Sequence, residues 1–300
     1  MPELYTVGPH VQIEYERLWT HLLQETTSHL LPTVKKVTVN GERRRMSQLG
    51  AVAYREITGR AMPTIANAPT TYVRWLVPKK YENPQLIPEW DAEDLGMLAT
   101  PQSAYLEADV YAYNRQVDAT IVSALNGNAI TGEDGTTLTA LPAGQIIDED
   151  FGTTNSGLTF AKVAEAKYRL DAAFVPQMNR HFICSPQEEQ DLINNVIEVK
   201  SSDYTKVQPI TDGSLMGKTW MGFNWHTQVR DLPQSEVSGS NYIRRAFAYH
   251  SDYIEFGDGQ RRVNIDVLAE RSQAIQIYAR ARMGASRRQE EGVVAIECYR

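Results

Sequence analysis

The segment that decides the fold is Gly213-Ser214-Leu215-Met216-Gly217-Lys218-Thr219-Trp220-Met221-Gly222-Phe223-Asn224-Trp225, because it fits two incompatible structures. Gly217-Lys218-Thr219 has the form of the end of a phosphate-binding P-loop. That loop needs a glycine five positions before its Gly-Lys pair, so that bare backbone amides surround the phosphates, and a helix directly after it. Position 212 holds the carboxylate of Asp212, and the residues that follow are bulky at every second position: Met221, Phe223, Trp225, Thr227 and Val229. This alternation predicts a strand entered through glycines, and not a nucleotide site.

Composition and charge exclude several classes of protein. The chain has 300 residues, 42% of them hydrophobic and 22% charged, which is ordinary for a globular protein of one or two domains. The net charge of -7 argues against a dedicated nucleic-acid binder, although it leaves room for a protein that encloses nucleic acid. Two cysteines cannot form a disulfide framework, and no signal peptide or apolar run of about 20 residues is visible. We therefore expect a cytosolic, reduced chain that makes no contact with membranes.

The N-terminal part of the chain predicts two extensions. Apolar residues at helical spacing predict a helix from Val11 to Leu31, which packs either on its own domain or, as an arm, on a neighbour. Residues 34–94 combine extended runs with several prolines and contain no convincing helix. Such a segment predicts a long hairpin that projects from the body and is covered by a partner. The basic run Arg43-Arg44-Arg45 is either a solvated loop or a salt-bridging patch.

The clearest helix begins at Thr100-Pro101, which suit an N-cap and a first helical position, and ends at Asn126-Gly127. Some 25 residues give a rod roughly 37 Å long, about twice the length of an average helix. Four polar residues lie off its apolar stripe and are expected to face solvent or another subunit: Glu107, Asp109, Asn114 and Asp118.

Helices and strands alternate in the second half of the chain. A helix is expected over 160–174, with these residues turned inward: Phe160, Val163, Leu170 and Phe174. A short buried strand over 181–184 follows, and Cys184 at its end is expected to be a core residue. Ser185-Pro186-Gln187-Glu188 is a capping box that opens a helix to Ile197.

The end of the chain predicts further strands. Residues 246–256 form a strand pair, and Gly257-Asp258-Gly259 forms a turn. The alternating runs 275–282 and 294–299 flank a polar connection, which predicts a closing hairpin.

No constellation of residues points to catalysis. The six histidines lack metal-ligand spacing, and His250-Ser251-Asp252 is not a triad, because triads are assembled from distant segments. No serine occupies a Gly-x-Ser-x-Gly elbow, and no glycine-rich dinucleotide fingerprint follows a strand. We predict no catalytic residue, no cofactor and no metal site.

The order of the predicted elements resembles that of the major capsid proteins of tailed bacteriophages: arm helix, long hairpin, rod-like helix, mixed α/β region and terminal strands. Local motifs carry the same resemblance. Ala112–Ile121 is similar to the family's spine-helix pattern, Arg180–Pro186 to its strand followed by Ser-Pro, and Gly213–Pro233 to its "Gly-x-x-Gly…Gly-Phe…Leu-Pro" segment. Ala246–His250 and Gly292–Ile296 match its closing strands. The resemblance covers nearly the whole chain.

The resemblance implies the α+β capsid (Johnson) fold and a structural role without enzymatic activity. It implies an N-terminal arm at 1–33 and an extended hairpin, or E-loop, at 34–85. It further implies a peripheral domain at 86–158 and 250–300, with its spine helix at 101–125, and an axial domain at 159–249.

The resemblance also implies partners. The chain is expected to self-assemble into hexamers and pentamers, in the host cytoplasm, as the icosahedral head of a tailed-phage virion. That head would enclose double-stranded DNA without sequence-specific contacts. Scaffolding, portal and cement or decoration proteins are further expected partners. The suspected contacts between subunits are Trp19, Arg43, Arg44, Arg45, Arg74, Trp75 and Lys218.

The sequence leaves two alternatives open. An encapsulin-like compartment shares the implied fold but encloses enzymes. A cytosolic P-loop or hydrolase enzyme belongs to a different class and predicts a small oligomer, whereas both shells predict closed particles.

Overall fold

The computed structural model describes residues 24–56, 66–87, 101–195, 214–238 and 241–300. The described helices are α2 (Pro101–Asn126), α3 (Phe160–Ala172) and α4 (Pro186–Asn195). The described strands are β1 (Lys35–Thr38), β2 (Arg44–Leu49), β3 (Thr71–Leu76), β4 (Lys79–Ile87), β5 (Ala129–Thr131), β6 (Thr137–Thr139), β7 (Ile146–Ile147), β8 (Arg180–Ile183), β9 (Thr219–Trp220), β10 (Phe223–His226), β11 (Gln234–Ser238), β12 (Asn241–His250), β13 (Ile254–Asp258), β14 (Arg262–Leu268), β15 (Ala274–Arg287) and β16 (Val293–Tyr299).

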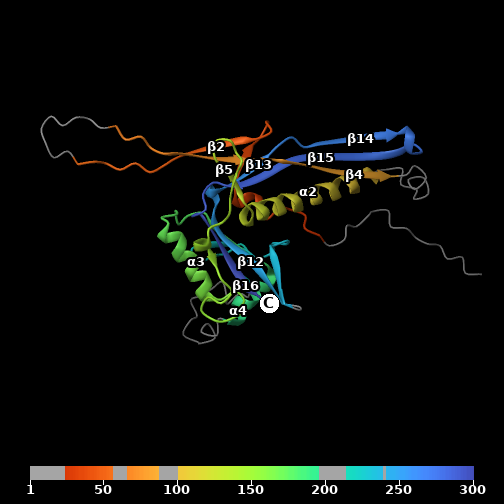
Figure 1. Ribbon diagram of the computed structural model, residues 1–300. Helices are drawn as coiled ribbons and strands as arrows, with labels where there is room; N and C mark the ends of the chain where they lie inside the picture. Colours follow the sequence, from red (N-terminus) through yellow and green to blue (C-terminus); the bar gives the residue numbers. More distant parts are fainter. Residues whose placement is uncertain (1–23, 57–65, 88–100, 196–213, 239–240) are drawn as a thin grey trace, which may run out of the picture.

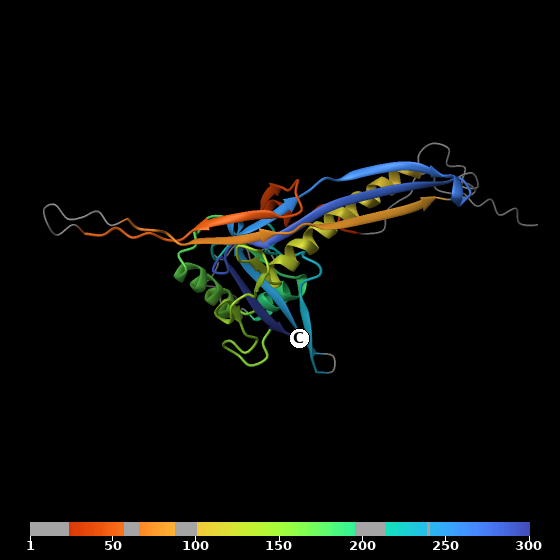
Figure 2. The ribbon, with the colours of Figure 1, turned by 45° about the horizontal axis from the view of Figure 1, so that its top comes forward.

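Two long extensions leave a body of sheet and helix in opposite directions (Figure 1). One is the ribbon that continues β2 and β3 away from the body. The other contains β4, β14 and β15 with α2 beside them, and a second view shows the same arrangement (Figure 2). The body itself carries α3, α4, β12 and β16. The two extensions therefore expose far more surface than the same residues would in a compact domain.

The strands form three sheets. A five-stranded sheet has the order β1-β13-β15-β14, and β4 pairs with the other edge of β15. A seven-stranded sheet has the order β7-β16-β12-β8-β10-β9, with β11 beside β12. A four-stranded sheet has the order β2-β3-β5-β6. Helices and mainly antiparallel sheets are combined, so the predicted α+β class is confirmed.

The rod-like helix is present as predicted. Helix α2 has 26 residues and packs along β15. Its C-terminal half is fully buried at Val117, Ile121 and Leu125. At the end of the helix, Gly127 N donates a hydrogen bond to Ser123 O at 2.8 Å. This agrees with the predicted stop at Asn126-Gly127.

The polar residues of α2 are not all solvated, so that prediction is wrong for two of the four. Asp109 is only 4% exposed and Asp118 only 7%. Asp109 accepts hydrogen bonds from Asn83 on β4 at 2.9 Å and from Arg261 at 2.7 Å. The helix lies between other segments on more than its apolar side, and those segments bring the partners that a buried carboxylate needs.

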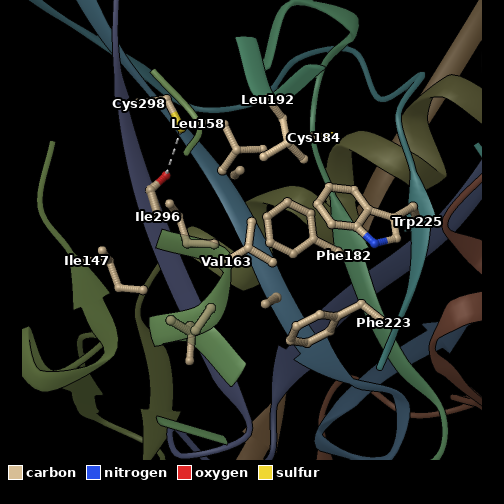
Figure 3. Close-up of a cluster of buried hydrophobic side chains, with 14 of the residues drawn as sticks. Ile147, Leu158, Val163, Phe182, Cys184, Leu192, Phe223, Trp225, Ile296 and Cys298 are labelled. Atoms are coloured by element: carbon tan, nitrogen blue, oxygen red, sulfur yellow. Dashed lines mark hydrogen bonds between the residues drawn. The ribbon is translucent and has the colours of Figure 1, made fainter. Parts of the chain in front are cut away.

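The seven-stranded sheet has an apolar cluster on each face, as the period-two alternation of strands requires. On one face Phe182, Trp225 and Ile296 lie beneath α3 and α4 (Figure 3). On the other face Ile183 and Phe247 pack against the C-terminal half of α2. The sheet thus connects the helices of the body to the base of both extensions.

The helix predicted over 160–174 ends two residues early, and two of its four inward residues point outward. Val163 and Leu170 are buried, whereas Phe160 is 50% and Phe174 92% exposed. Phe174 lies beyond the helix with a φ of 55°, which turns its side chain away from the core. The predicted capping box before α4 is confirmed, because Ser185 N donates to the Glu188 carboxylate at 2.7 Å. Cys184 is fully buried, as expected.

The predicted closing hairpin does not exist. Strand β15 continues to Arg287 and pairs with β13, β14 and β4, whereas β16 pairs with β12 and β7 in another sheet. Alternation identifies a strand but not its partner. The turn predicted at 257–259 is also wrong at its first two residues, because Gly257 and Asp258 lie within β13. A Cβ on Gly257 would come within 2.6 Å of Leu76 and 2.8 Å of Val39, so this glycine serves close packing.

The N-terminal helix prediction falls mainly outside the described residues. The part of it that the structure describes, residues 24–30, is not helical, and Leu31–Thr33 forms a single 3-10 turn. Hydrogen bonds to the Asp118 carboxylate hold residues 28–30 against α2.

The segment that offered two structures proves to be a hairpin. Strand β9 pairs with β10, and the residues between them, Met221 and Gly222, have φ values of 52° and 83°. Positive φ at both positions is the requirement of a two-residue type I′ turn. Met221 is therefore in a turn and not in the predicted strand, while Phe223 and Trp225 are fully buried, as expected. Because a strand and not a helix follows Gly217-Lys218, the geometry of a P-loop is absent.

Candidate assembly surfaces

The ribbon beyond β2 and β3 has no core of its own. Gly50 N donates to Thr70 O at 2.7 Å, and further out Asn67 Nδ2 donates to Ala53 O at 3.0 Å. Large apolar side chains along the ribbon are exposed: Leu49, Val52, Tyr54 and Tyr72. A two-stranded ribbon is marginally stable alone in water, and exposed apolar strands invite pairing. This ribbon therefore has the properties of a surface that is covered by another molecule.

The base of the ribbon is fixed to the body by a buried ion pair. Both terminal nitrogens of Arg74 on β3 bond to the two carboxylate oxygens of Glu290, and both side chains are about nine-tenths buried. Gln48 on β2 donates to Arg288 O at 2.6 Å. Trp75 Nε1 donates to Gly132 O at 2.8 Å. These bonds join β2 and β3 to the connection after β15 and to the turn between β5 and β6, and so set the direction in which the ribbon leaves the body.

A second buried arginine closes the C-terminal end of α2 at the same junction. Arg287 is fully buried and donates to Ala124 O at 2.9 Å and Leu125 O at 2.8 Å. The last carbonyls of a helix lack intrahelical donors and carry partial negative charge, so a guanidinium there satisfies both needs. The spine helix and the ribbon thus meet at one junction of β15.

Separating the Arg74–Glu290 pair should destabilise the chain strongly. Arg74→Met or Glu290→Gln leaves one buried charge without its partner, and we expect each to lower the free energy of unfolding by about 3–5 kcal/mol. The double variant Arg74→Met/Glu290→Met removes both charges and should cost much less. Urea denaturation measures all three. Single variants within about 0.5 kcal/mol of the unchanged chain would contradict this role of the pair.

Residues 24–33 lie against α2 as a strap that Asp118 holds. The Asp118 carboxylate accepts hydrogen bonds from Ser28 Oγ, from His29 N at 2.9 Å and from Leu30 N at 3.2 Å. Two further bonds link the strap to α2, from Asn114 to Thr26 O at 2.8 Å and from Arg115 to the Gln24 side chain at 2.7 Å. The fully buried Leu30 anchors the strap in the core. Residues 24–33 are therefore attached to the spine helix mainly through the Asp118 carboxylate, with Asn114, Arg115 and the buried Leu30 adding further contacts.

Docking of this strap should depend on pH through Glu25. Burial, then the hydrogen bond with Asp118 and its charge, raise the pKa of Glu25 from 4.5 to about 7, and Arg230 and Arg115 oppose the shift. An acid whose folded pKa is raised stabilises the folded form while it is protonated, so docking should weaken as the pH rises from about 4.5 to about 7. Protection of the Leu30 amide against hydrogen exchange, corrected for intrinsic rates, should be higher at acid pH.

Glu25→Gln provides the control, because it imitates the protonated acid. The variant should keep its strap protected on both sides of neutrality. His29 Nε2 lies 3.5 Å from the Glu25 carboxylate, and burial lowers the pKa of His226. A pH dependence that persists in Glu25→Gln would assign the effect to another group and contradict the role of Glu25.

A fully buried lysine joins three segments of the body. Lys162 Nζ on α3 donates to the carbonyl oxygens of Ser156 at 2.7 Å, Glu149 at 2.9 Å, Glu297 at 2.9 Å and Gly157 at 3.1 Å. Burial lowers the pKa of this ammonium. An ammonium has three protons, so four carbonyls share them around one charge. Lys162 thereby fixes the loop before α3 and strand β16 to the helix.

The other extension also exposes apolar side chains, along edge strand β14. Val263, Ile265 and Val267 alternate along it and are exposed. Beside them the Arg261 guanidinium lies 4.6 Å from the centre of the Tyr113 ring and bonds to Asp109 at 2.7 Å. The five-stranded sheet therefore ends in an apolar edge next to an ion pair between the exposed Arg261 and the buried Asp109 of the spine helix.

The described residues contain no arrangement for metal chemistry. Among them, no group of three or more His, Cys, Asp and Glu side chains could hold an ion. His181 Nδ1 lies 3.1 Å from His226 Nε2, and burial, with smaller effects of His226 and His250, lowers the pKa of His181 to about 4. This histidine is therefore neutral near pH 7 and forms part of the packing. No helix among the described residues has the length and apolar character needed to span a membrane.

Comparison with known families decides among the predicted classes. A family model described as phage capsid protein matches residues 7–300. The chain belongs to the phage capsid protein family. Its role is accordingly that of a structural protein of a phage shell, and neither the enzyme nor the encapsulin-like compartment is favoured. A search of curated protein sequences finds no significant match.

Solved structures show that this capsid protein has the predicted fold. The capsid of Ralstonia phage GP4 matches with a TM-score of 0.71 and 10% identity, over 100% of this chain and 98% of that chain. The Cyanophage Pam1 capsid asymmetric unit matches with a TM-score of 0.70 and 10% identity, over 98% of both chains. A structure of Mycobacterium phage Che8 matches with a TM-score of 0.66 and 19% identity, over 95% of this chain and 97% of that chain. The predicted capsid fold is thereby confirmed.

The residues predicted as contacts between subunits lie in different settings in this capsid protein. Trp19 lies outside the described residues. Arg43 and Arg45 are exposed near the base of the ribbon, and Arg45 is 4.0 Å from the exposed Glu133 carboxylate. Arg44 donates to Thr38 O at 3.2 Å, while Arg74 and Trp75 hold the base of the ribbon within the chain. Lys218 is half-buried, and its backbone N donates to Leu215 O at 3.1 Å.

Several residues that organise these surfaces carried no recognised signal in the sequence. Asp118, Lys162, Arg287 and Glu290 each bind groups that lie far away along the chain. For Lys162 one signal is available in the sequence: the charged residue directly precedes Val163, a predicted core residue, and so lies at the border of the apolar stripe of the helix. The other three have ordinary sequence surroundings.

Proposed function

We propose that this capsid protein is the major capsid protein of a tailed phage. Copies of it assemble into hexamers and pentamers, and these form an icosahedral head around double-stranded DNA. The observation that carries this proposal is the family match over residues 7–300, in a chain whose ribbon exposes apolar strands that have no cover within the described residues. A shell subunit needs such surfaces, whereas a soluble monomer avoids them.

Each region is assigned a mechanical role in this proposal. The arm (1–33) and the extended hairpin (34–85) tie neighbouring copies together. The peripheral domain (86–158 and 250–300) contains the spine helix, and the axial domain (159–249) forms the centre of each capsomer. Arg43, Arg45 and Lys218 are proposed to contact adjacent copies, as is Trp19, while Arg44, Arg74 and Trp75 act at the base of the hairpin.

The proposal includes further partners and a location. The head assembles in the host cytoplasm and becomes part of the virion, together with portal, scaffolding and cement or decoration proteins. The net charge of -7 supports a container that does not grip its DNA.

Negative-stain imaging of the purified chain tests the proposal. We expect closed particles or ring-shaped capsomers, whose size distribution is checked by sedimentation velocity. A small, stable and discrete oligomer under all conditions of concentration and salt would contradict the proposed function.

A further inference from the structure

The end of helix α3 has the geometry of a glycine cap, but the residue at the cap is phenylalanine. Phe174 N donates to Asp171 O at 3.0 Å, and Val175 N donates to Leu170 O at 3.0 Å. This pair of bonds is the Schellman motif, whose left-handed position is usually glycine because a β-carbon is disfavoured there. Phe174 occupies that position with a φ of 55°. The backbone at Phe174 is therefore strained, because this position carries a side chain where glycine would be unstrained.

The strained position is held rigidly from inside the body. Arg180, which is only 2% exposed, donates to Val175 O at 2.5 Å and to Pro176 O at 2.8 Å. Its guanidinium also lies 2.7 Å from the Asp171 carboxylate. Val175 is buried in the same apolar cluster as Leu170, which is the hydrophobic contact that accompanies this cap. The direction of the Phe174 side chain is thus fixed before any partner binds.

The Phe174 ring is not packed against the described part of the chain. Phe174 is 92% exposed. Two other large apolar side chains lie close to it in the chain and are also exposed, Tyr168 on the outer side of α3 and Met178 in the loop after it. Backbone strain at a side chain that packs against none of the described residues indicates a function outside the subunit.

We propose that Phe174 is an anchor residue of the contact between two copies of this chain in the assembled shell. This inference rests on the proposed function, and a second copy is the partner because the solved relatives are capsids. A large aromatic ring is the type of residue that dominates interface energies. Rigid presentation keeps the cost of ordering it low. Tyr168 and Met178 extend the same contact.

Phe174→Gly separates this role from a role in folding. Glycine suits the left-handed position, so the unassembled variant should unfold at the same temperature as the unchanged chain or slightly above it. Assembly should move in the opposite direction. We expect the protein concentration needed for shell formation to rise about tenfold, as for the loss of an interface aromatic. Light scattering gives the threshold, and calorimetry gives the unfolding temperature.

Two further variants complete the test. Phe174→Asn also accepts the left-handed conformation without the ring, and it should behave like Phe174→Gly. Asn155→Gly relaxes another left-handed residue, with a φ of 49°, and should leave the threshold unchanged. Shells that form at the unchanged threshold in both Phe174 variants overturn this inference but not the proposed function, as does a lower unfolding temperature in Phe174→Gly. An unchanged chain that never forms shells overturns both.

Discussion

We expect that a chain in which a two-residue turn replaces residues 51–69 will fold normally but form no shells. The described residues of this stretch contribute no side chain to the buried core. The hydrogen bond from Gly50 N to Thr70 O, at 2.7 Å, already brings the two ends together, so a tight hairpin turn can join them. The unfolding temperature should therefore stay within about 2 °C, which corresponds to roughly 1 kcal/mol for a chain of this size. The loss of assembly should be complete, because the shortened chain lacks the ribbon proposed to lie on its neighbour.

The control for this experiment keeps the length of the ribbon. Val52→Ser/Tyr54→Ser removes two exposed apolar side chains and leaves the backbone intact. This variant should assemble weakly and at higher concentration, because it loses apolar contact area but not the reach of the ribbon. Sedimentation velocity and imaging distinguish the three proteins. Closed shells formed by the shortened chain would show that the ribbon is not needed for assembly.

Lys162→Met should destabilise the body strongly. Methionine has a similar length but donates no hydrogen bond, so the four carbonyls of Glu149, Ser156, Gly157 and Glu297 lose the group that they share. Buried acceptors without partners cost about 1–3 kcal/mol each, and partial relaxation of the loop lowers the sum. We expect a loss of at least about 3 kcal/mol in the free energy of unfolding and a fall of roughly 5 °C in the unfolding temperature.

Lys167→Met is the matched control on the same helix. Lys167 is only half-buried, so the same chemical change there should alter stability by about 0.5 kcal/mol or less. Calorimetry and urea denaturation of the unassembled chains compare the two. Equal effects of the two variants would mean that the buried ammonium does not hold the loop before α3.

The elements that could be predicted from the sequence are those that local signals determine. Helix α2 has an apolar stripe and a glycine stop, so both of its ends are predicted nearly correctly. Helix α4 has a capping box, so its start is predicted correctly, while the predicted end at Ile197 lies outside the described residues. The fold family could be predicted because such elements follow one another in a characteristic order, although each motif alone is weak. The rejection of a nucleotide site also depended on local signals, namely Asp212 and the alternation after Lys218.

The contacts that organise the assembly surfaces are not local, and they escaped prediction for that reason. In the sequence Asp118 has the pattern of a solvated helix residue. Its partners are residues 28–30, which lie about ninety positions earlier in the chain. The partners of β15 are chosen among several alternating strands, which sequence periodicity cannot rank. Phe174 was expected to be a core residue because its spacing continues the helix, and only the left-handed cap turns it outward.

The central claim is that the ribbon of one copy is covered by an adjacent copy in a closed shell. A cryo-electron microscopy reconstruction of the assembled particles tests it most directly. The account predicts rings of six and five copies, with the ribbon between β2 and β3 of each copy lying on the peripheral sheet or spine helix of its neighbour. A reconstruction in which the ribbon folds back on its own body, or extends into solvent without touching another copy, would contradict the account.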